Sequence, residues 1–169
     1  MIYVRIDKAQ AAAALRRLDP AQFRQRLTGA IRSTLKDAKQ DGSQLVKRRY
    51  TAKSPLSLGK ISVRSAGLNG TMKVSGRRNL IKRFYLTPST RPPHRPPGGL
   101  HVHIVRGSGG NLLHAFVNRA GVVFKNVGGR KLEHLSTISL AGMFKAVGEK
   151  VEEKMSQRLE RRIEEAFSL

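Results

Sequence analysis

The sequence contains no cysteine and no tryptophan, and only nine of its 169 residues are phenylalanine or tyrosine. Without cysteine, disulfides, thiolate catalysis and cysteine-ligated metal are excluded. A chain of this length buries roughly 70% of its unfolded surface as one domain, and here that core must be mainly aliphatic. The longest apolar run, Ala11 to Leu15, is far short of the ~20 residues that cross a bilayer. We therefore expect no membrane span and no secretory signal peptide.

Acidic residues are almost absent from the middle of the chain. Between Thr51 and Leu135 there are fifteen Lys or Arg residues and one acid, Glu133. Residues 1–50 hold twelve bases and four acids, whereas residues 136–169 hold six of each. The whole chain has a formal net charge of +22, and charge this dense repels itself unless an anionic neighbour is present. We interpret the middle as facing DNA or an acidic partner, and the ends as packing and assembly elements.

The N-terminal part is predicted to form a short strand and a long helix. Apolar residues alternate from Ile2 to Ile6, which is the pattern of a strand with one buried face. Asp19-Pro20 predicts a helix start, because proline is tolerated at the first helical position. Apolar residues then recur at four-residue steps from Phe23 as far as Val46, and Gly42 is a position where the helix could kink or end early.

The middle is predicted to be an antiparallel sheet. Ile61–Val63 and Met72–Val74 favour a hairpin through the turn-like segment Gly67–Gly70, in which Asn69-Gly70 is the turn signal. Leu80–Leu86 favours a third strand. Alternation between residues 100 and 124 predicts a meander. The segment 87–99 contains five prolines and two glycines, so we expect an extended loop there.

The C-terminal part is predicted to be one amphipathic helix of about seven turns. The fold class that follows is α+β, with a long N-terminal helix, an antiparallel β-sheet in the middle and a long C-terminal amphipathic helix. We expect a single domain, residues 1–169, composed of an N-terminal strand and helices (1–49), a basic sheet with the extended loop 87–99 (50–135), and the C-terminal helix (136–169). The apolar positions assigned to subunit or core packing are Leu140, Phe144, Val147, Val151, Leu159 and Ile163.

No arrangement of residues predicts catalysis. His101 and His103 lie two apart on a predicted strand and so share one face. A metal site needs three or four ligands and a second-shell acceptor for them. The only carboxylate in the middle of the chain is Glu133. The glycine-rich segments do not precede the Lys-Ser/Thr of a phosphate loop, and there is no Gly-x-Ser-x-Gly elbow. We therefore expect neither an enzyme nor a metal site or cofactor.

The basic residues are the stronger signal of binding. We assign Lys82, Arg83, Arg91, Arg95 and Arg106 to contact with DNA or with an acidic partner, and solvated surface is the alternative. Phe84 and Tyr85 are the only aromatic pair beside basic residues in the sequence. Because RNA readers with sequence specificity present more surface aromatics, we expect electrostatic contact with the nucleic-acid backbone.

From about residue 40 to its end, the chain contains a series of short segments in a characteristic order: Tyr50-Thr51, Lys82-Arg83-Phe84, Gly99 to Gly107, Ala115 to Val117, Val123 to Gly128, Arg130-Lys131-Leu132, Ser139 to Phe144 and Arg158-Leu159-Glu160. This order of segments resembles the prophage minor tail protein Z family. Residues 133–139 depart from the pattern, since a proline and a Gly-Pro-Ser turn are expected there.

The resemblance implies a structural virion protein, a minor tail or tail-completion (neck) subunit at the head–tail junction around the DNA passage. It implies other neck and tail proteins as partners. It also implies that the protein is in the host cytoplasm before assembly and in the virion afterwards. Tail symmetry suggests a homo-oligomeric ring of six copies, with twelve copies or a monomer that assembles only on the virion as alternatives. Charge alone is also compatible with a general nucleic-acid-binding protein, and a nuclease would need clustered carboxylates or a metal.

Overall fold

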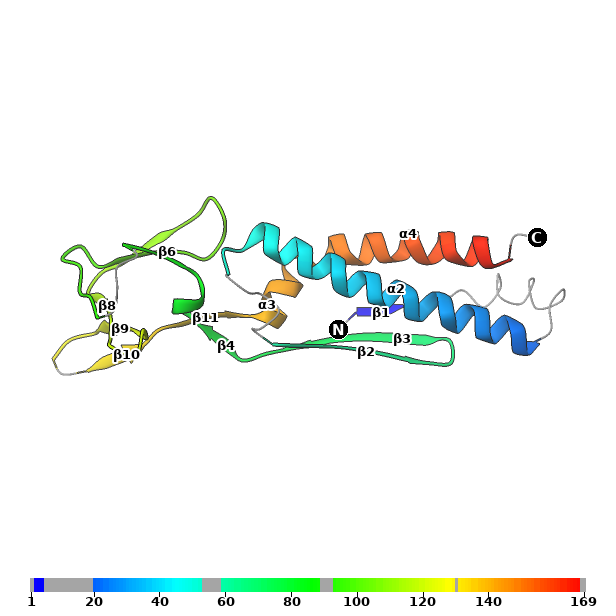
Figure 1. The fold of residues 1–169 in the computed structure, drawn as a ribbon, viewed down its shortest axis with the longest axis horizontal. Helices are drawn as coiled ribbons and strands as arrows, with labels where there is room; N and C mark the ends of the chain where they lie inside the picture. The colour runs from blue at the N-terminus through cyan, green and yellow to red at the C-terminus, as the bar shows by residue number, and fades with distance from the viewer. Residues whose placement is uncertain (1, 5–19, 53–58, 89–92, 130, 168–169) are drawn as a thin grey trace. The chain divides into compact units, whose positions relative to one another are not determined.

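The computed structural model describes residues 2–4, 20–52, 59–88, 93–129 and 131–167. The predicted α+β class is confirmed, with a helix on each side of antiparallel strands along the chain (Figure 1). Contacts divide the chain into two compact units. Unit 1 comprises Met1–Ser43, Lys60–Ser75 and Phe144–Leu169, and unit 2 comprises Gln44–Gly59 and Gly76–Met143. Folding of 1–169 as a single domain stays a prediction.

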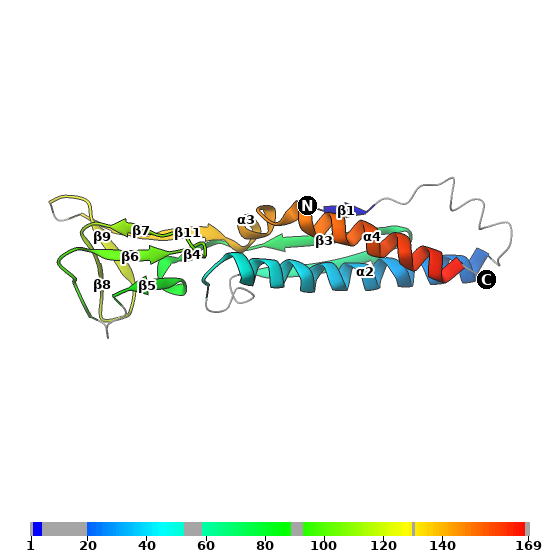
Figure 2. The ribbon, with the colours of Figure 1, turned by 90° about the horizontal axis from the view of Figure 1, so that it is seen from above.

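Unit 1 contains two helices and a three-stranded antiparallel sheet of order β1-β3-β2 (Figure 1, Figure 2). The five elements are α2 (Pro20–Arg49), α4 (Gly148–Phe167), β1 (Ile2–Val4), β2 (Lys60–Ala66) and β3 (Asn69–Ser75). Helix α4 runs antiparallel to α2, and α2 packs on the β2–β3 hairpin, where Gly70 lies against Ile31 and Leu35.

Helix α2 has the buried stripe that its sequence predicts. Phe23, Leu27, Ile31, Leu35 and Ala38 are each at most 2% exposed. The helix does not end at Gly42 but continues to Arg49. Gly42 is buried against the ring of Phe144, and a Cβ at this position would collide with that ring. The glycine therefore permits a close approach of two elements rather than marking a helix end.

Two predictions are wrong in detail. The hairpin turn lies within the predicted segment Gly67–Gly70, but at Gly67-Leu68 and not at Asn69-Gly70, because Asn69 pairs with Ala66 inside the ladder. Gly67 takes the positive φ of 56° that the turn requires. The C-terminal helix is not continuous. A short α3 (Leu140–Lys145) ends before α4 begins at Gly148, and the Val147 N–H donates to the Phe144 carbonyl, an i−3 bond that tightens the chain between the two helices.

Unit 2 is built from short antiparallel strands in three small sheets, not in one continuous sheet as predicted. Their orders are β5-β6-β7, β10-β9-β8 and β11-β4. The strands are β4 (Arg78–Leu80), β5 (Tyr85–Thr87), β6 (Leu100–His103), β7 (Gly110–Leu112), β8 (Ala115–Val117), β9 (Val123–Asn126), β10 (Leu132–His134) and β11 (Ser136–Ser139). The predicted strand Leu80–Leu86 is divided by a 3₁₀ turn, η2 (Ile81–Arg83), because Ile81 and Phe84 both turn inward to buried positions.

The core of unit 2 lies between β6 and the β8–β9 pair. Leu100 and Val102 alternate with His101 and His103 on β6, and only the two aliphatic residues are buried. The whole buried cluster is Ile81, Leu100, Val102, Ala115, Val117 and Val123. Strands β6, β8 and β9 therefore bury aliphatic residues on the inner face and leave His101, His103, Phe116 and Phe124 partly exposed on the outer face.

The last residues of α2, from Gln44 onward, belong to unit 2 and are held there by backbone hydrogen bonds. Tyr50 bridges to Val105, and the Arg106 N–H donates to the carbonyl of Arg49 over 2.8 Å. In the predicted extended loop, the described residues 93–99 contain no helix or strand apart from one bridge between His94 and Val117. Among the described helices, none combines the length and the apolar character of a membrane span.

Candidate nucleic-acid and partner interface

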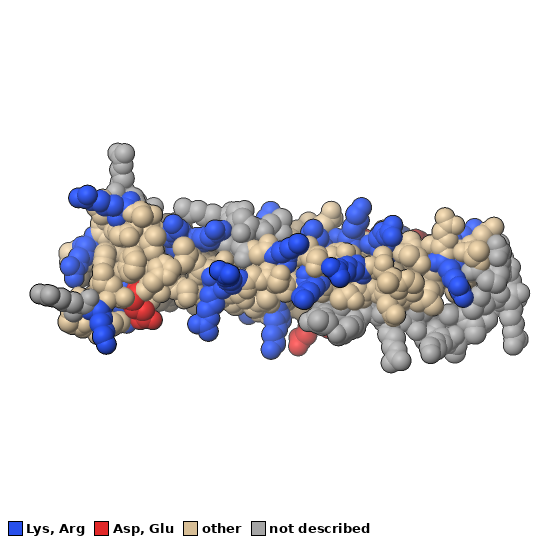
Figure 3. Space-filling model, turned by 90° about the horizontal axis from the view of Figure 1, so that it is seen from below, with Lys and Arg blue, Asp and Glu red and all other residues tan. Residues whose placement is uncertain are grey.

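Positive charge is concentrated in unit 2. Its described residues include twelve Lys or Arg and one acid, Glu133, whereas the other eight acids of the described chain all lie in unit 1. Glu133 on β10 lies directly opposite Lys125 on β9 in the strand register. Figure 3 shows one face of the molecule, on which blue Lys and Arg side chains are many and red acids few. Unit 2 is therefore the part that most needs an anionic neighbour.

Lys82 and Arg83 lie on the 3₁₀ turn η2 and are exposed. They stand between Ile81, which is 5% exposed, and Phe84, which is 1% exposed. The two buried side chains fix the turn, so that both basic side chains leave the same short segment toward solvent. The two residues of the aromatic pair follow this turn and differ in exposure, because Phe84 enters the core while Tyr85 is 55% exposed.

Arg106, which follows β6 in the chain, lies in space beside the C-terminal end of α2. Its Nε donates to the carbonyl of Lys47 over 3.2 Å, next to the backbone bond to Arg49. A cation here satisfies carbonyls that a helix leaves unpaired at its C-terminus. Arg106 is thus brought together with the basic triplet Lys47-Arg48-Arg49, which is exposed. This cluster combines residues almost 60 positions apart, so the sequence alone does not reveal it.

Arg95 is exposed, and its guanidinium lies over the ring of Phe116, 5.7 Å from the centroid. Arg91 lies outside the described residues. The predicted basic contacts are therefore distributed over unit 2: Lys82 and Arg83 on one turn, Arg106 at the end of α2, and Arg95 against an aromatic ring on β8.

The apolar residues assigned to packing are mostly inside the chain's own core. Leu140 and Val151 are fully buried, and Phe144, Val147 and Leu159 are at most 6% exposed. Ile163 is only partly buried. Five of the six side chains therefore have almost no surface left for a neighbouring subunit, and Ile163 is the one with surface to offer.

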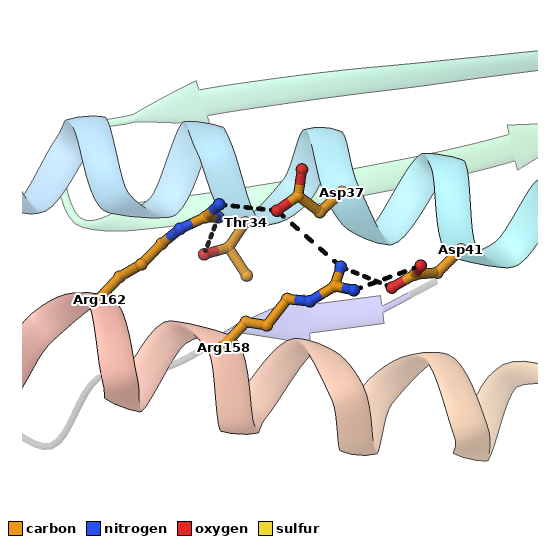
Figure 4. Close-up of polar contacts among 5 residues, drawn as sticks. All are labelled: Thr34, Asp37, Asp41, Arg158 and Arg162. Carbon is orange, nitrogen blue, oxygen red and sulfur yellow. Dashed lines mark hydrogen bonds and ion pairs between the residues drawn. The ribbon is translucent and has the colours of Figure 1, made fainter.

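An ion-pair network between α2 and α4 was not predicted (Figure 4). Arg162 Nη2 lies 2.7 Å from Asp37 Oδ2, and Arg162 Nη1 donates to Thr34 Oγ1 over 3.1 Å. Arg158 Nη1 lies 2.6 Å from Asp41 Oδ2 and 3.9 Å from Asp37. The partners are spaced i, i+4 on each helix, which could have suggested such a pairing once the helices were known to be antiparallel.

The network changes the charge that α4 presents outward. Arg158 and Arg162 turn toward α2, whereas the six acids of α4 are all exposed and only three of its bases are. In the sequence, residues 136–169 are electrically neutral, with six bases and six acids. In the folded unit, the exposed side of α4 is acidic: Glu149, Glu152, Glu153, Glu160, Glu164 and Glu165.

Histidines give no metal centre in the described part of the chain. His101 and His103 share one face of β6, with ring centroids 4.5 Å apart, and Tyr85 lies beside His103. A ring nitrogen of His101 is hydrogen bonded to the Asn111 side chain. Among the described residues, no group of three or more His, Cys, Asp or Glu is placed to hold a metal ion.

Comparison of the chain with known protein families, with curated proteins and with solved structures gives no match.

Proposed function

We propose that this chain is a structural phage virion protein of the prophage minor tail protein Z kind, a tail-completion or neck subunit that forms a ring around the DNA passage at the head–tail junction. The observation that supports this most is the separation of charge: twelve bases and one acid in the described residues of unit 2. A surface of this kind is stable in contact with packaged DNA or an acidic neighbour.

Unit 1 is suited to assembly. Its two α2 acids, Asp37 and Asp41, are occupied by arginines of α4, and the exposed side of α4 is acidic. That side is complementary in charge to the basic unit 2 of another copy. A contact between different surfaces of identical copies closes into a ring under cyclic symmetry, and six copies match the symmetry of a tail.

The role in this proposal is architectural and involves no reaction and no cofactor. The partners are further copies of the chain and other neck and tail proteins, with non-specific contact to DNA. The protein is in the host cytoplasm before assembly and in the virion afterwards.

A deletion tests the proposal. Without the gene, filled heads and tails are expected to accumulate without joining productively, and infectious particles at normal titre would contradict it. Complementation then tests the basic surface. The double variant Lys82→Glu with Arg83→Glu in unit 2 is expected not to restore infectious particles. The control, Lys150→Glu with Lys154→Glu on α4, makes the same change of charge in unit 1 and is expected to reduce the yield of infectious particles less.

A general nucleic-acid-binding protein is the second candidate, favoured by the exposure of Lys82, Arg83, Arg95 and Arg106. It predicts that the purified chain binds duplex DNA with an affinity that falls steeply with salt, about 0.9 log units per log unit of salt for each phosphate contacted. A shallow slope counts against this candidate. Loss of infectivity with unjoined heads and tails separates the neck subunit from it.

A further inference from the structure

A row of aromatic side chains crosses the β8–β9–β10 sheet. Phe116 on β8 lies directly opposite Phe124 on β9, with ring centroids 6.1 Å apart and planes at 25°. His134 on β10 lies opposite Phe124 on its other side, at 5.5 Å. Arg95 extends the row by covering the ring of Phe116. We call Arg95, Phe116, Phe124 and His134 the aromatic row.

The aromatic row lies on the outer face of its sheet. Ala115 and Val117 flank Phe116 on β8 and are buried in the core of unit 2, so alternation directs Phe116 to the opposite side. Val123 and Phe124 are related in the same way on β9. Phe116 and Phe124 are partly exposed, and Arg95 and His134 are exposed.

This placement is unusual for a chain with six phenylalanines. Phe23, Phe84 and Phe144 are buried, whereas the two on this sheet are adjacent to each other and reach solvent. A solvent-facing ladder position can be filled by any strand-favouring residue, such as Thr or Val as well as Phe. Two neighbouring aromatic rings beside an arginine instead provide π faces and a cation at one place.

The charge around the aromatic row favours a polyanion over an apolar protein segment. Arg119 follows β8 and Lys131 precedes β10, and both are exposed. Glu133, the one acid among the described residues of unit 2, alternates with His134 and so projects from the other face of β10. Aromatic rings interleaved with cations are the features that bind single-stranded nucleic acids, because every base has a π face and every nucleotide a phosphate.

We infer that the aromatic row is a binding site for single-stranded nucleic acid, in which unpaired bases stack on Phe116 and Phe124 while Arg95 and the neighbouring cations contact phosphates. Duplex DNA keeps its bases within its own stack and meets only the cations. The site therefore distinguishes single strands from duplexes, which backbone electrostatics alone does not predict. The inference does not depend on the place of the chain in a virion.

The chain has no tryptophan, so Phe124→Trp introduces a single fluorescent reporter into the row. Addition of an oligothymidine of about 20 nucleotides to the full-length variant is expected to quench this fluorescence, and a duplex of the same length is expected to leave it nearly unchanged. Equal quenching by both, or by neither, would overturn the inference.

Affinity measurements give a second test that does not need the reporter. At about 0.5 M salt, where phosphate contacts are weakened, the wild-type chain is expected to bind oligothymidine about tenfold more tightly than duplex. Phe116→Leu with Phe124→Leu should weaken oligothymidine binding by about tenfold and leave duplex binding within about twofold, whereas Phe116→Tyr with Phe124→Tyr keeps the π faces and should bind as wild type.

Tyr85→Leu is the control, because Tyr85 is an exposed aromatic residue on a different sheet of unit 2, β5-β6-β7. It is expected to leave oligothymidine binding unchanged. An equal loss in Tyr85→Leu, or no loss in the double leucine variant, contradicts the assignment. If the leucine variant does not fold, which circular dichroism would show, the tyrosine variant and the tryptophan reporter still decide the matter. A surface that binds only protein would give no preference for single strands in any of these assays.

Discussion

Replacing Arg162 with alanine should destabilise unit 1 far more than replacing its neighbour Arg161. Both are arginines on α4, but they face different surroundings. Arg162 is 29% exposed and bonds Asp37 over 2.7 Å and Thr34 over 3.1 Å, whereas Arg161 is 80% exposed and pairs with Glu165 one turn along the same helix. The substitution and the host helix are the same, so the difference isolates the interhelical contacts.

The expected magnitude follows from these contacts. The ion pair with Asp37 is partly exposed on both sides, which limits it to about 1 kcal/mol. Thr34 is 1% exposed, so removing the donor to its hydroxyl adds about 0.5–1 kcal/mol. Together the loss in the free energy of unfolding is about 1.5–2 kcal/mol for Arg162→Ala. An exposed i, i+4 pair contributes about 0.3–0.5 kcal/mol, and alanine recovers part of this through its helix propensity.

Urea unfolding followed by far-ultraviolet circular dichroism measures both variants, because the helices α2 and α4 dominate the signal. A double-mutant cycle that combines Arg162→Ala with Asp37→Asn should give a coupling energy of about 1 kcal/mol for the Asp37–Arg162 pair. Raising the salt from about 0.15 M to 1 M, which shortens the Debye length from about 8 Å to 3 Å, should reduce this coupling. Equal midpoints for Arg161→Ala and Arg162→Ala would refute the role of the network.

Three further predictions concern packing and charge. Gly42→Ala should lower the free energy of unfolding by about 1–3 kcal/mol because the new methyl group meets the Phe144 ring, while Gly29→Ala, which has open space, should raise it by about 0.5–1 kcal/mol; equal effects in thermal unfolding would contradict this. Asn79→Ala removes the donor to the Ile138 carbonyl at 2.8 Å from a side chain that is 6% exposed, so a loss of about 1–3 kcal/mol is expected in denaturant titration, and a change below about 0.5 kcal/mol would disagree. Lys82→Ala with Arg83→Ala should reduce the slope of duplex affinity against salt by up to about 2, and an unchanged slope would mean that neither side chain contacts phosphate.

Local pattern was sufficient to predict the elements with strong periodicity. The four-residue spacing from Phe23 to Ala38 gave α2, and alternation gave the β2–β3 hairpin and β6. Errors occurred where tertiary contacts decide the local conformation. Gly42 has the signal of a helix break, but the Phe144 ring occupies the space that a side chain would need. Asn69-Gly70 has the signal of a turn, but Gly70 is required in the strand for contact with Ile31 and Leu35.

The candidate site was predictable in composition and not in arrangement. The excess of bases in the middle is visible in the sequence, and so is the exposure of Lys82 and Arg83 beside apolar neighbours. The cross-strand pairing of Phe116 with Phe124 depends on the register of the β8–β9 hairpin, which the hydrogen bonds between Asn118 and Val122 fix and apolar alternation alone does not. The attachment of Arg106 to the end of α2 and the inward turn of Arg158 depend on long-range packing.

Electron cryomicroscopy of the assembled particle tests the central proposal most directly. We expect a ring of this chain at the head–tail junction, with Lys82, Arg83 and Arg106 within a screening length, about 8 Å, of DNA phosphates or of carboxylates on a neighbouring subunit. A particle that lacks the chain, or a ring whose basic unit faces only solvent, would contradict it.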